Sequence, residues 1–134
     1  NIIIENVTIP NQRFHIDCSD IENFVIRSSI FFNMRATEST PVEMIEASNN
    51  HFVDVFSWGT ITPGTNWTSG PVPMEGGVLP VNGPTMWPND DFDRYRPLRG
   101  SVVDDRVIGG DILIDATSLP RSIPTTLGGL QANN

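Results

Sequence analysis

Residues 1–9 read Asn-Ile-Ile-Ile-Glu-Asn-Val-Thr-Ile and are followed by the pair Pro10-Asn11. Six of these nine side chains are β-branched (four Ile, one Val and one Thr), and such side chains fit the pleated surface of a β-strand. A Pro-Asn pair is typical of a turn. The chain therefore opens with a predicted strand that ends at a turn near residue 10.

Similar short segments recur along the chain, and none of ten or more residues has a convincing helical period. They are separated by turn signals at intervals of about 8–12 residues, as in β-sandwiches and barrels. We therefore predict an all-β fold, an antiparallel β-sandwich of jelly-roll type with long Pro/Gly loops. The other predicted strands lie at residues 14–18, 24–32, 41–45, 51–58, 78–81, 101–103, 106–108 and 111–115.

The texture of the sequence changes between Thr62 and Gly100, where Pro and Gly recur every few residues. Both residues disfavour the interior of a strand, whereas the aromatic residues among them are rare in disordered linkers. We therefore expect long ordered loops at 62–100, within a single β domain at 1–117. The Pro- and Gly-containing tail at 118–134 is predicted to be an arm or a linker.

An internal similarity offers an alternative fold. Asn1–Asn6 aligns with Asn23–Ser28 at an offset of 22 residues, and both align with Asn50–Val55 after a further 27. Repeats of this length indicate stacked coils. The aligned segments resemble coils of the right-handed parallel β-helices found in pectate-lyase-type enzymes and phage tailspikes. This resemblance implies a short right-handed parallel β-helix, with one ladder through residues 2–5, 24–27 and 51–54.

Composition excludes several classes of function. The 134 residues include 16 acidic and 8 basic side chains, which gives a net charge of −8. All eight basic residues are arginine, because the sequence contains no lysine. A nucleic-acid partner is not expected, since such binding depends on basic residues that neutralise phosphates. Membrane insertion is not expected either, because no apolar run approaches the roughly 20 residues that a spanning helix needs.

Aromatic residues are the best candidates for a binding surface. Tryptophan in a Pro/Gly loop either covers the core or forms an exposed platform for a sugar ring or a protein partner. On this basis the predicted ligand- or partner-binding residues are Trp58, Trp67, Trp87 and Tyr95. If the tryptophans are exposed and coplanar, the chain is a carbohydrate-binding module.

The densest acidic cluster lies at Asn89–Asp93. Carboxylates grouped in a loop suit Ca²⁺, which takes six to eight oxygen ligands, although the spacing of an EF-hand is absent. A calcium site would use Asp90, Asp91 and Asp93. The alternative is a solvated acidic loop that pairs with the arginines downstream, in which case the protein needs no cofactor.

Residues that could support catalysis are few. His15 and His51 each lie inside a predicted strand among apolar neighbours, which indicates a structural or interface role. Cys18 lies between Asp17 and Asp20, whose charges raise the pKa of a thiol, so we expect a small buried side chain. No serine has the glycine pattern of a nucleophile elbow. We therefore expect a protein that is not an enzyme.

The whole chain resembles the β-domains of virion surface proteins in its acidic, lysine-free and loop-rich composition. Because it starts at Asn1 and not at Met, we interpret it as part of a longer chain. The resemblance implies a non-enzymatic domain on the virion surface or outside the cell, acting in particle assembly or host attachment. The partners that it implies are a second or third copy of the chain, other capsid or virion subunits, and a host glycan. The alternatives are a carbohydrate-binding module and a fragment of a β-helical, carbohydrate-active tailspike.

Overall fold

The computed structural model describes residues 1–16, 23–36, 45–53, 64–78, 92–104, 106, 115–118, 120–121 and 126–132. Of residues 10–16, 32–36, 45, 78 and 92–93 it describes the backbone alone. The elements are β1 (Ile2–Glu5), β2 (Thr8–Ile16), β3 (Phe24–Arg27), β4 (Ile30–Ala36), β5 (Ile45–Ser48), β6 (His51–Phe52), β7 (Thr68–Ser69), β8 (Pro73–Met74), β9 (Gly77–Val78) and the 3-10 helix η2 (Phe92–Tyr95).

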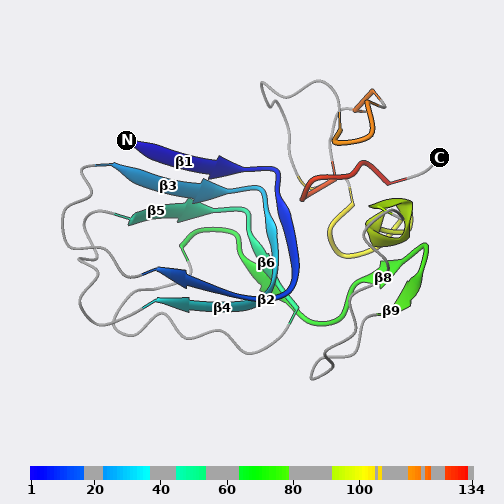
Figure 1. The fold of residues 1–134 in the computed structure, drawn as a ribbon, viewed down its shortest axis with the longest axis horizontal. Coiled ribbons are helices and arrows are strands. Elements are labelled where there is room, and N and C mark those ends of the chain that lie inside the picture. The colour runs from blue at the N-terminus through cyan, green and yellow to red at the C-terminus, as the bar shows by residue number, and fades with distance from the viewer. Residues whose placement is uncertain are drawn as a thin grey trace.

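Two parallel sheets dominate the fold. The first sheet has the strand order β1-β3-β5 and the second has the order β2-β4-β6-β7, whereas β8 and β9 form a short antiparallel pair. The chain runs along the first sheet, bends, and returns along the second, and each pass lies beside the previous one (Figure 1). The described strands therefore build stacked parallel coils, and the prediction of an antiparallel β-sandwich is wrong.

The turn predicted at Pro10-Asn11 explains part of this error. Both residues lie inside β2, where the pairing with β4 changes register between Ile9 and Arg13. Proline donates no backbone hydrogen bond, and an irregular edge strand is the place in a sheet that tolerates it. β2 is one of the two edge strands among the described strands of the second sheet, so Pro10 interrupts the ladder without reversing the chain.

The ladder predicted from the internal repeat, through residues 2–5, 24–27 and 51–54, is correct for its first two segments only. Ile2 pairs with Phe24 in parallel, which is the register that the alignment of residues 1–6 with 23–28 predicts. The next partner of Phe24 is Ile45 and not His51. His51 pairs with Ile30 in the second sheet, so the predicted third repeat was placed on the wrong side of the bend.

Each described bend from the first sheet to the second contains a residue in the left-handed backbone conformation. These residues are Asn6, Ser28, Asn49 and Asn66, with φ values of 51°, 55°, 54° and 53°. Positive φ is uncommon outside glycine, and asparagine is among the residues that tolerate it best. The spacings are 22, 21 and 17 residues (28 − 6, 49 − 28 and 66 − 49). The bends therefore mark four successive coils.

Backbone and side-chain hydrogen bonds join the bends to one another. The amides of Asn6, Ser28 and Asn49 each donate to a carbonyl of the following coil. The Ser29 hydroxyl accepts from the Val7 amide at 3.2 Å. The buried Asn50 side chain accepts from the Ser29 amide at 3.2 Å and donates to the Ile26 carbonyl at 3.0 Å. The buried side chains of Ser29 and Asn50 are thus paired from coil to coil, as their desolvation requires.

The space between the two sheets is apolar. Phe24 and Ile26 are buried while Val25 and Arg27 between them are half-buried, so the first two face the second sheet. On the second sheet, Phe31 and Phe52 lie in register and stack with ring centroids 6.0 Å apart. The coils are therefore joined in two ways, by aromatic stacking in the space between the sheets and by the hydrogen bonds at the bends.

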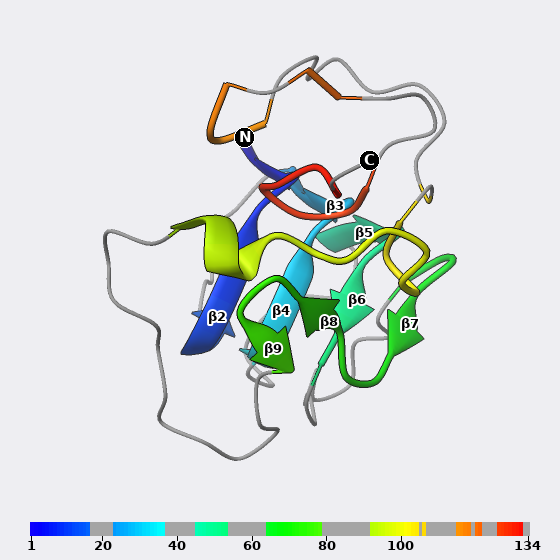
Figure 2. The same cartoon turned by 90° about the vertical axis from the view of Figure 1, so that its right-hand side faces the viewer.

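Described segments that follow β7 cover the other face of the second sheet. Figure 2 shows β8, β9, η2 and the segment 126–132 in front of β2, β4, β6 and β7. Leu127 and Leu130 are buried there, and an added Cβ on Gly128 would clash with the Thr8 hydroxyl. Residues 126–132, which fall within the predicted arm at 118–134, are thus held closely by the coils. No helix in the described part of the chain is long and apolar enough to cross a bilayer.

Two further predicted strands can be compared with the structure. The strand predicted at 101–103 is part of a turn, in which the Asp104 amide donates to the Ser101 carbonyl at 3.0 Å. Val103 is fully buried at this turn, which explains the apolar signal without a strand. Of the strand predicted at 78–81, Gly77–Val78 forms β9, and the residues after Val78 lie outside the described part.

A buried ion pair fixes the C-terminal segments to one another. The Arg96 guanidinium donates to the Asp115 carboxylate and to the Gln131 carbonyl, both at 2.6 Å, and both charged side chains are almost fully buried. Arg96 also donates to the Thr117 hydroxyl at 2.8 Å. A buried charge needs such complete pairing, because its desolvation is costly. Segments 115–118 and 126–132 therefore depend on Arg96.

Replacement of Asn50 by alanine tests the side-chain hydrogen bonds that join the bends. It leaves the Ser29 amide and the Ile26 carbonyl without their side-chain partner, and each buried unsatisfied group costs about 1–3 kcal/mol. We expect a loss of that order in the free energy of unfolding, measured with urea. The matched control is Asn49→Gly, which keeps a residue suited to positive φ and changes stability by less than about 1 kcal/mol. Equal losses in both variants would contradict the role assigned to Asn50.

Replacement of Arg96 by methionine tests the buried ion pair. It leaves the Asp115 carboxylate buried without its cation, which costs about 3–5 kcal/mol in the free energy of unfolding. The double variant Arg96→Met/Asp115→Leu removes both charges and should recover part of this loss. Urea unfolding of both variants provides the measurement. A double variant less stable than Arg96→Met would show that the pair does not act as a unit.

Candidate functional site

Trp67 lies at the bend of the fourth coil, directly after Asn66. Its side chain is 41% exposed, and its ring meets Phe52 at 6.2 Å with an interplanar angle of 63°. Ser69 pairs in register with Phe52, so its exposed side chain lies on the same face of the second sheet as Phe52. Trp67 therefore covers the last ring of the aromatic stack and presents part of its indole to solvent.

The backbone around Trp67 is held by His51, which is fully buried in β6. The His51 Nε2 lies 2.7 Å from the Gly70 carbonyl, which can only accept, so Nε2 bears the proton. Nδ1 then accepts from the Thr68 hydroxyl at 2.7 Å. One imidazole thus bonds to two residues of the fourth coil, on the C-terminal side of Trp67.

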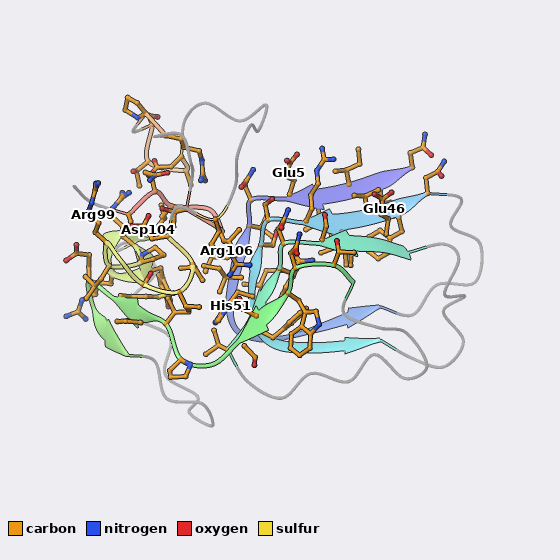
Figure 3. All side chains as sticks on the ribbon, turned by 180° about the vertical axis from the view of Figure 1, so that it is seen from behind. Glu5, Glu46, His51, Arg99, Asp104 and Arg106 are labelled. Atoms are coloured by element: carbon orange, nitrogen blue, oxygen red, sulfur yellow. The ribbon has the colours of Figure 1, made fainter. Side chains whose placement is uncertain are left out.

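Arg106 bonds to residues on both sides of Trp67. Its guanidinium donates to the Asn66 carbonyl at 2.8 Å and to the Thr68 hydroxyl at 3.0 Å. A third bond, at 3.2 Å, goes to the Val102 carbonyl and anchors Arg106 to the C-terminal part of the fold. Figure 3 shows His51 and Arg106 close together between the coils and this C-terminal part. The bend at residues 66–68 is therefore fixed from two directions.

Electrostatics keep His51 neutral. Burial lowers the pKa of His51 below its ordinary value, and the positive charge of Arg106 lowers it further. The hydrogen bond with the Gly70 carbonyl opposes both effects but is smaller than the effect of burial. A neutral ring with its proton on Nε2 matches the observed bonds, because the same Nδ1 must accept from Thr68.

The His51–Thr68 pair resembles a general base beside a hydroxyl nucleophile, but its surroundings favour a structural role. A general base must reach the group from which it takes a proton. His51 has no exposed surface, and both of its ring nitrogens are bonded within the protein. The arrangement therefore stabilises the bend and presents an aromatic surface.

The other predicted binding residues are separated from Trp67 or lie outside the described part. Trp58 and Trp87 fall in the undescribed segments. Tyr95 is only 8% exposed and belongs to the apolar cluster around Met74 and Val103. Trp67 is therefore the one predicted aromatic residue that the structure describes at the surface.

The predicted calcium ligands cannot be compared in the same way. Asp90 and Asp91 lie outside the described residues, and only the backbone of Asp93 is described, in η2. Within the described ranges, no group of three His, Cys, Asp or Glu side chains could hold a metal ion. Asp115 pairs with Arg96, and the two carboxylate oxygens of Asp104 accept from Gly100 and Thr126. These two carboxylates are thus used within the fold.

Thr68, Gly70 and Arg106 were not predicted from the sequence as parts of this site. Arg106 is 40 residues from Asn66, and no local pattern links the two. A usable signal is the recurrence of Asn or Ser at the bends, because the spacing from Asn49 to Asn66 places Trp67 and Thr68 after a fourth bend. The aromatic residue was thus visible in the sequence, whereas its anchors were not.

Comparison of the chain with protein-family models, with curated proteins and with solved structures finds no match in any of the three.

The lowered pKa of His51 predicts a pH dependence of stability. The unfolded chain takes up this proton near pH 6.5, while the folded protein resists it until the pH reaches the lower folded pKa. Protonation of His51 therefore does not reduce the free energy of unfolding well above pH 6.5. This free energy decreases as the pH falls from 6.5 to the lower folded pKa. The slope is at most about 1.4 kcal/mol per pH unit, the value for one proton.

Urea unfolding of the wild type and of His51→Gln between about pH 7 and pH 5 provides the measurement, since carboxylates titrate mostly below this range. The glutamine variant should lose the slope in this range. An identical slope in both proteins would contradict the role of His51.

Proposed function

We propose that this chain is a non-enzymatic domain of a virion surface that acts in particle assembly or host attachment. The fold supports a scaffold role, because stacked coils form a rigid unit whose ends are natural points of contact. The side chains of Ser29 and Asn50 at the described bends bond from coil to coil, which also favours a structural role over catalysis. The expected setting is the virion surface or another extracellular site.

The observation that best supports assembly is the apolar outer edge of the first coil. Ile2 is 43% exposed, whereas Phe24, its in-register neighbour in the second coil, is 4% exposed. Ile3 is 63% exposed. Among the described strands β1 pairs only with β3, so one edge of β1 presents apolar side chains together with backbone groups. Such an edge favours pairing with another strand.

Charge narrows the choice of partner. The chain has a net charge of −8, so a partner that offers a phosphate backbone is disfavoured. On the first sheet Glu5 is already paired with Arg27 at 3.1 Å, which leaves the isoleucines as the prominent feature of β1. A second or third copy of the chain, or another virion subunit, is the partner that we propose for this edge.

A second candidate function, a carbohydrate-binding module, is favoured by the exposed indole of Trp67. It concerns the opposite end of the coil stack and does not exclude assembly through β1.

Replacement of Ile3 by aspartate tests the proposed assembly. A charge at the exposed edge of β1 should prevent association without unfolding the domain, because Ile3 is mostly in solvent. We expect light scattering to report a dimer or trimer for the wild type and a monomer for Ile3→Asp. The control is Val102→Asp, which adds the same charge at a side chain that is 43% exposed on the C-terminal turn.

Two results would contradict assembly through β1. One is a wild type that stays monomeric up to about 100 µM, a concentration at which even weak specific contacts associate. The other is an oligomer that Ile3→Asp and Val102→Asp leave equally intact.

A further inference from the structure

We propose that the bend of the fourth coil is a binding site for a neutral saccharide, with the Trp67 indole as the stacking surface and Ser69 as a hydrogen-bonding group. The site lies on the fourth coil, whereas the proposed assembly edge is β1 of the first coil. The inference rests on the second candidate function, a carbohydrate-binding module, and is independent of the assembly role.

The first argument is the exposure of an ordered indole. Trp67 leaves 41% of its surface open although its ring contacts Phe52. The C–H face of a sugar ring packs well on an indole, while nearby hydroxyls bond its polar rim. Thr65, Asn66 and Ser69 are exposed beside Trp67 and supply hydroxyl and amide groups. The surface thus combines an apolar platform with uncharged polar neighbours.

The second argument is rigidity. A platform binds more tightly when the protein does not have to order it first. Arg106 bonds to Asn66 and Thr68 on either side of Trp67, and His51 bonds to Thr68 and Gly70. Bonds from β6 and from the C-terminal part thus fix the bend before a ligand arrives.

Charge favours a neutral ligand. Residues 64–74 contain no ionisable side chain. The nearest described cation, Arg106, directs three hydrogen bonds to carbonyl and hydroxyl oxygens of the protein itself. An acidic saccharide would therefore find no dedicated carboxylate partner on this stretch, and the net charge of −8 would repel it.

The backbone disfavours an extended peptide as the ligand. β7 has only two residues, and the amides of Thr68 and Gly70 already donate to carbonyls of the third coil. In a parallel ladder this leaves Ser69 as the residue whose backbone groups face away from β6. One residue is too little for the addition of a strand, but it can bond to the hydroxyls of a sugar.

The test follows the indole N–H resonances of ¹⁵N-labelled protein during titration with cellohexaose, maltohexaose and chitohexaose. The chain has three tryptophans, and Trp67→Phe identifies the resonance of Trp67 by its loss. We expect at least one of these neutral probes to shift that resonance saturably, with a Kd in about the millimolar range typical of a single small platform. Oligogalacturonate of the same length serves as the acidic comparison and should not bind.

Two variants separate stacking from misfolding. Trp67→Ala should weaken binding at least about tenfold, as expected for a central aromatic contact, and can be followed through the sugar signals. Ser69→Arg leaves the apolar stack intact because Ser69 is exposed, yet its long side chain should block the indole and abolish the shift. Leu98→Ala, at an exposed site outside the bend and its anchoring hydrogen bonds, should bind like the wild type.

Three results would overturn the proposal. The first is no shift of the Trp67 resonance with any neutral probe at about 10 mM, well above the expected Kd. The second is unchanged affinity in Ser69→Arg or in folded Trp67→Ala. The third is binding of oligogalacturonate alone.

Discussion

The left-handed bend between the two sheets is the constraint on which the other features of the structure depend. Asn6, Ser28, Asn49 and Asn66 adopt nearly the same positive φ, although most side chains avoid it. The amides of the first three donate to carbonyls of the following coil. Each of these bonds offsets the cost of the positive φ and also sets the register between neighbouring strands. Because this arrangement repeats, β1, β3 and β5 stack in one sheet while β2, β4, β6 and β7 stack in the other.

The residue after each bend determines whether a coil bonds to the previous coil through a polar side chain or presents an aromatic ring. At this position Ser29 and Asn50 bond to backbone groups of the previous coil, and this joins the first three coils. Trp67 occupies the same position in the fourth coil and cannot repeat these bonds, so its indole packs on Phe52 and stays partly in solvent. His51 and Arg106 supply the bonds that hold this last bend. The candidate binding surface thus forms at the bend where Trp67 takes the position that a polar side chain occupies in the second and third coils.

The sequence revealed the strands more readily than their pairing. Alternation of apolar and polar residues is the same in parallel and antiparallel strands, so the β-branched run at Ile2–Ile4 could not show its partner. The offset of 22 residues placed the second coil correctly. The third coil was wrongly aligned on Asn50, because its first strand, Ile45–Ser48, has few strand-forming residues. An alignment anchored at the bends would have placed Asn49 beneath Ser28. Long-range anchors such as Arg106 and the Arg96–Asp115 pair had no local signal.

Disulfide formation between engineered cysteines tests the coil register most directly. Val25 and Glu46 are in-register neighbours on the solvent side of the first sheet, within the reach of a disulfide. Ser48 is two residues further along, at about 7–8 Å from Val25, which is beyond that reach. In a Cys18→Ser background, Val25→Cys/Glu46→Cys should form an intramolecular disulfide readily and Val25→Cys/Ser48→Cys should not. Failure of the first pair, or equal formation in both, would contradict stacked parallel coils in the register described.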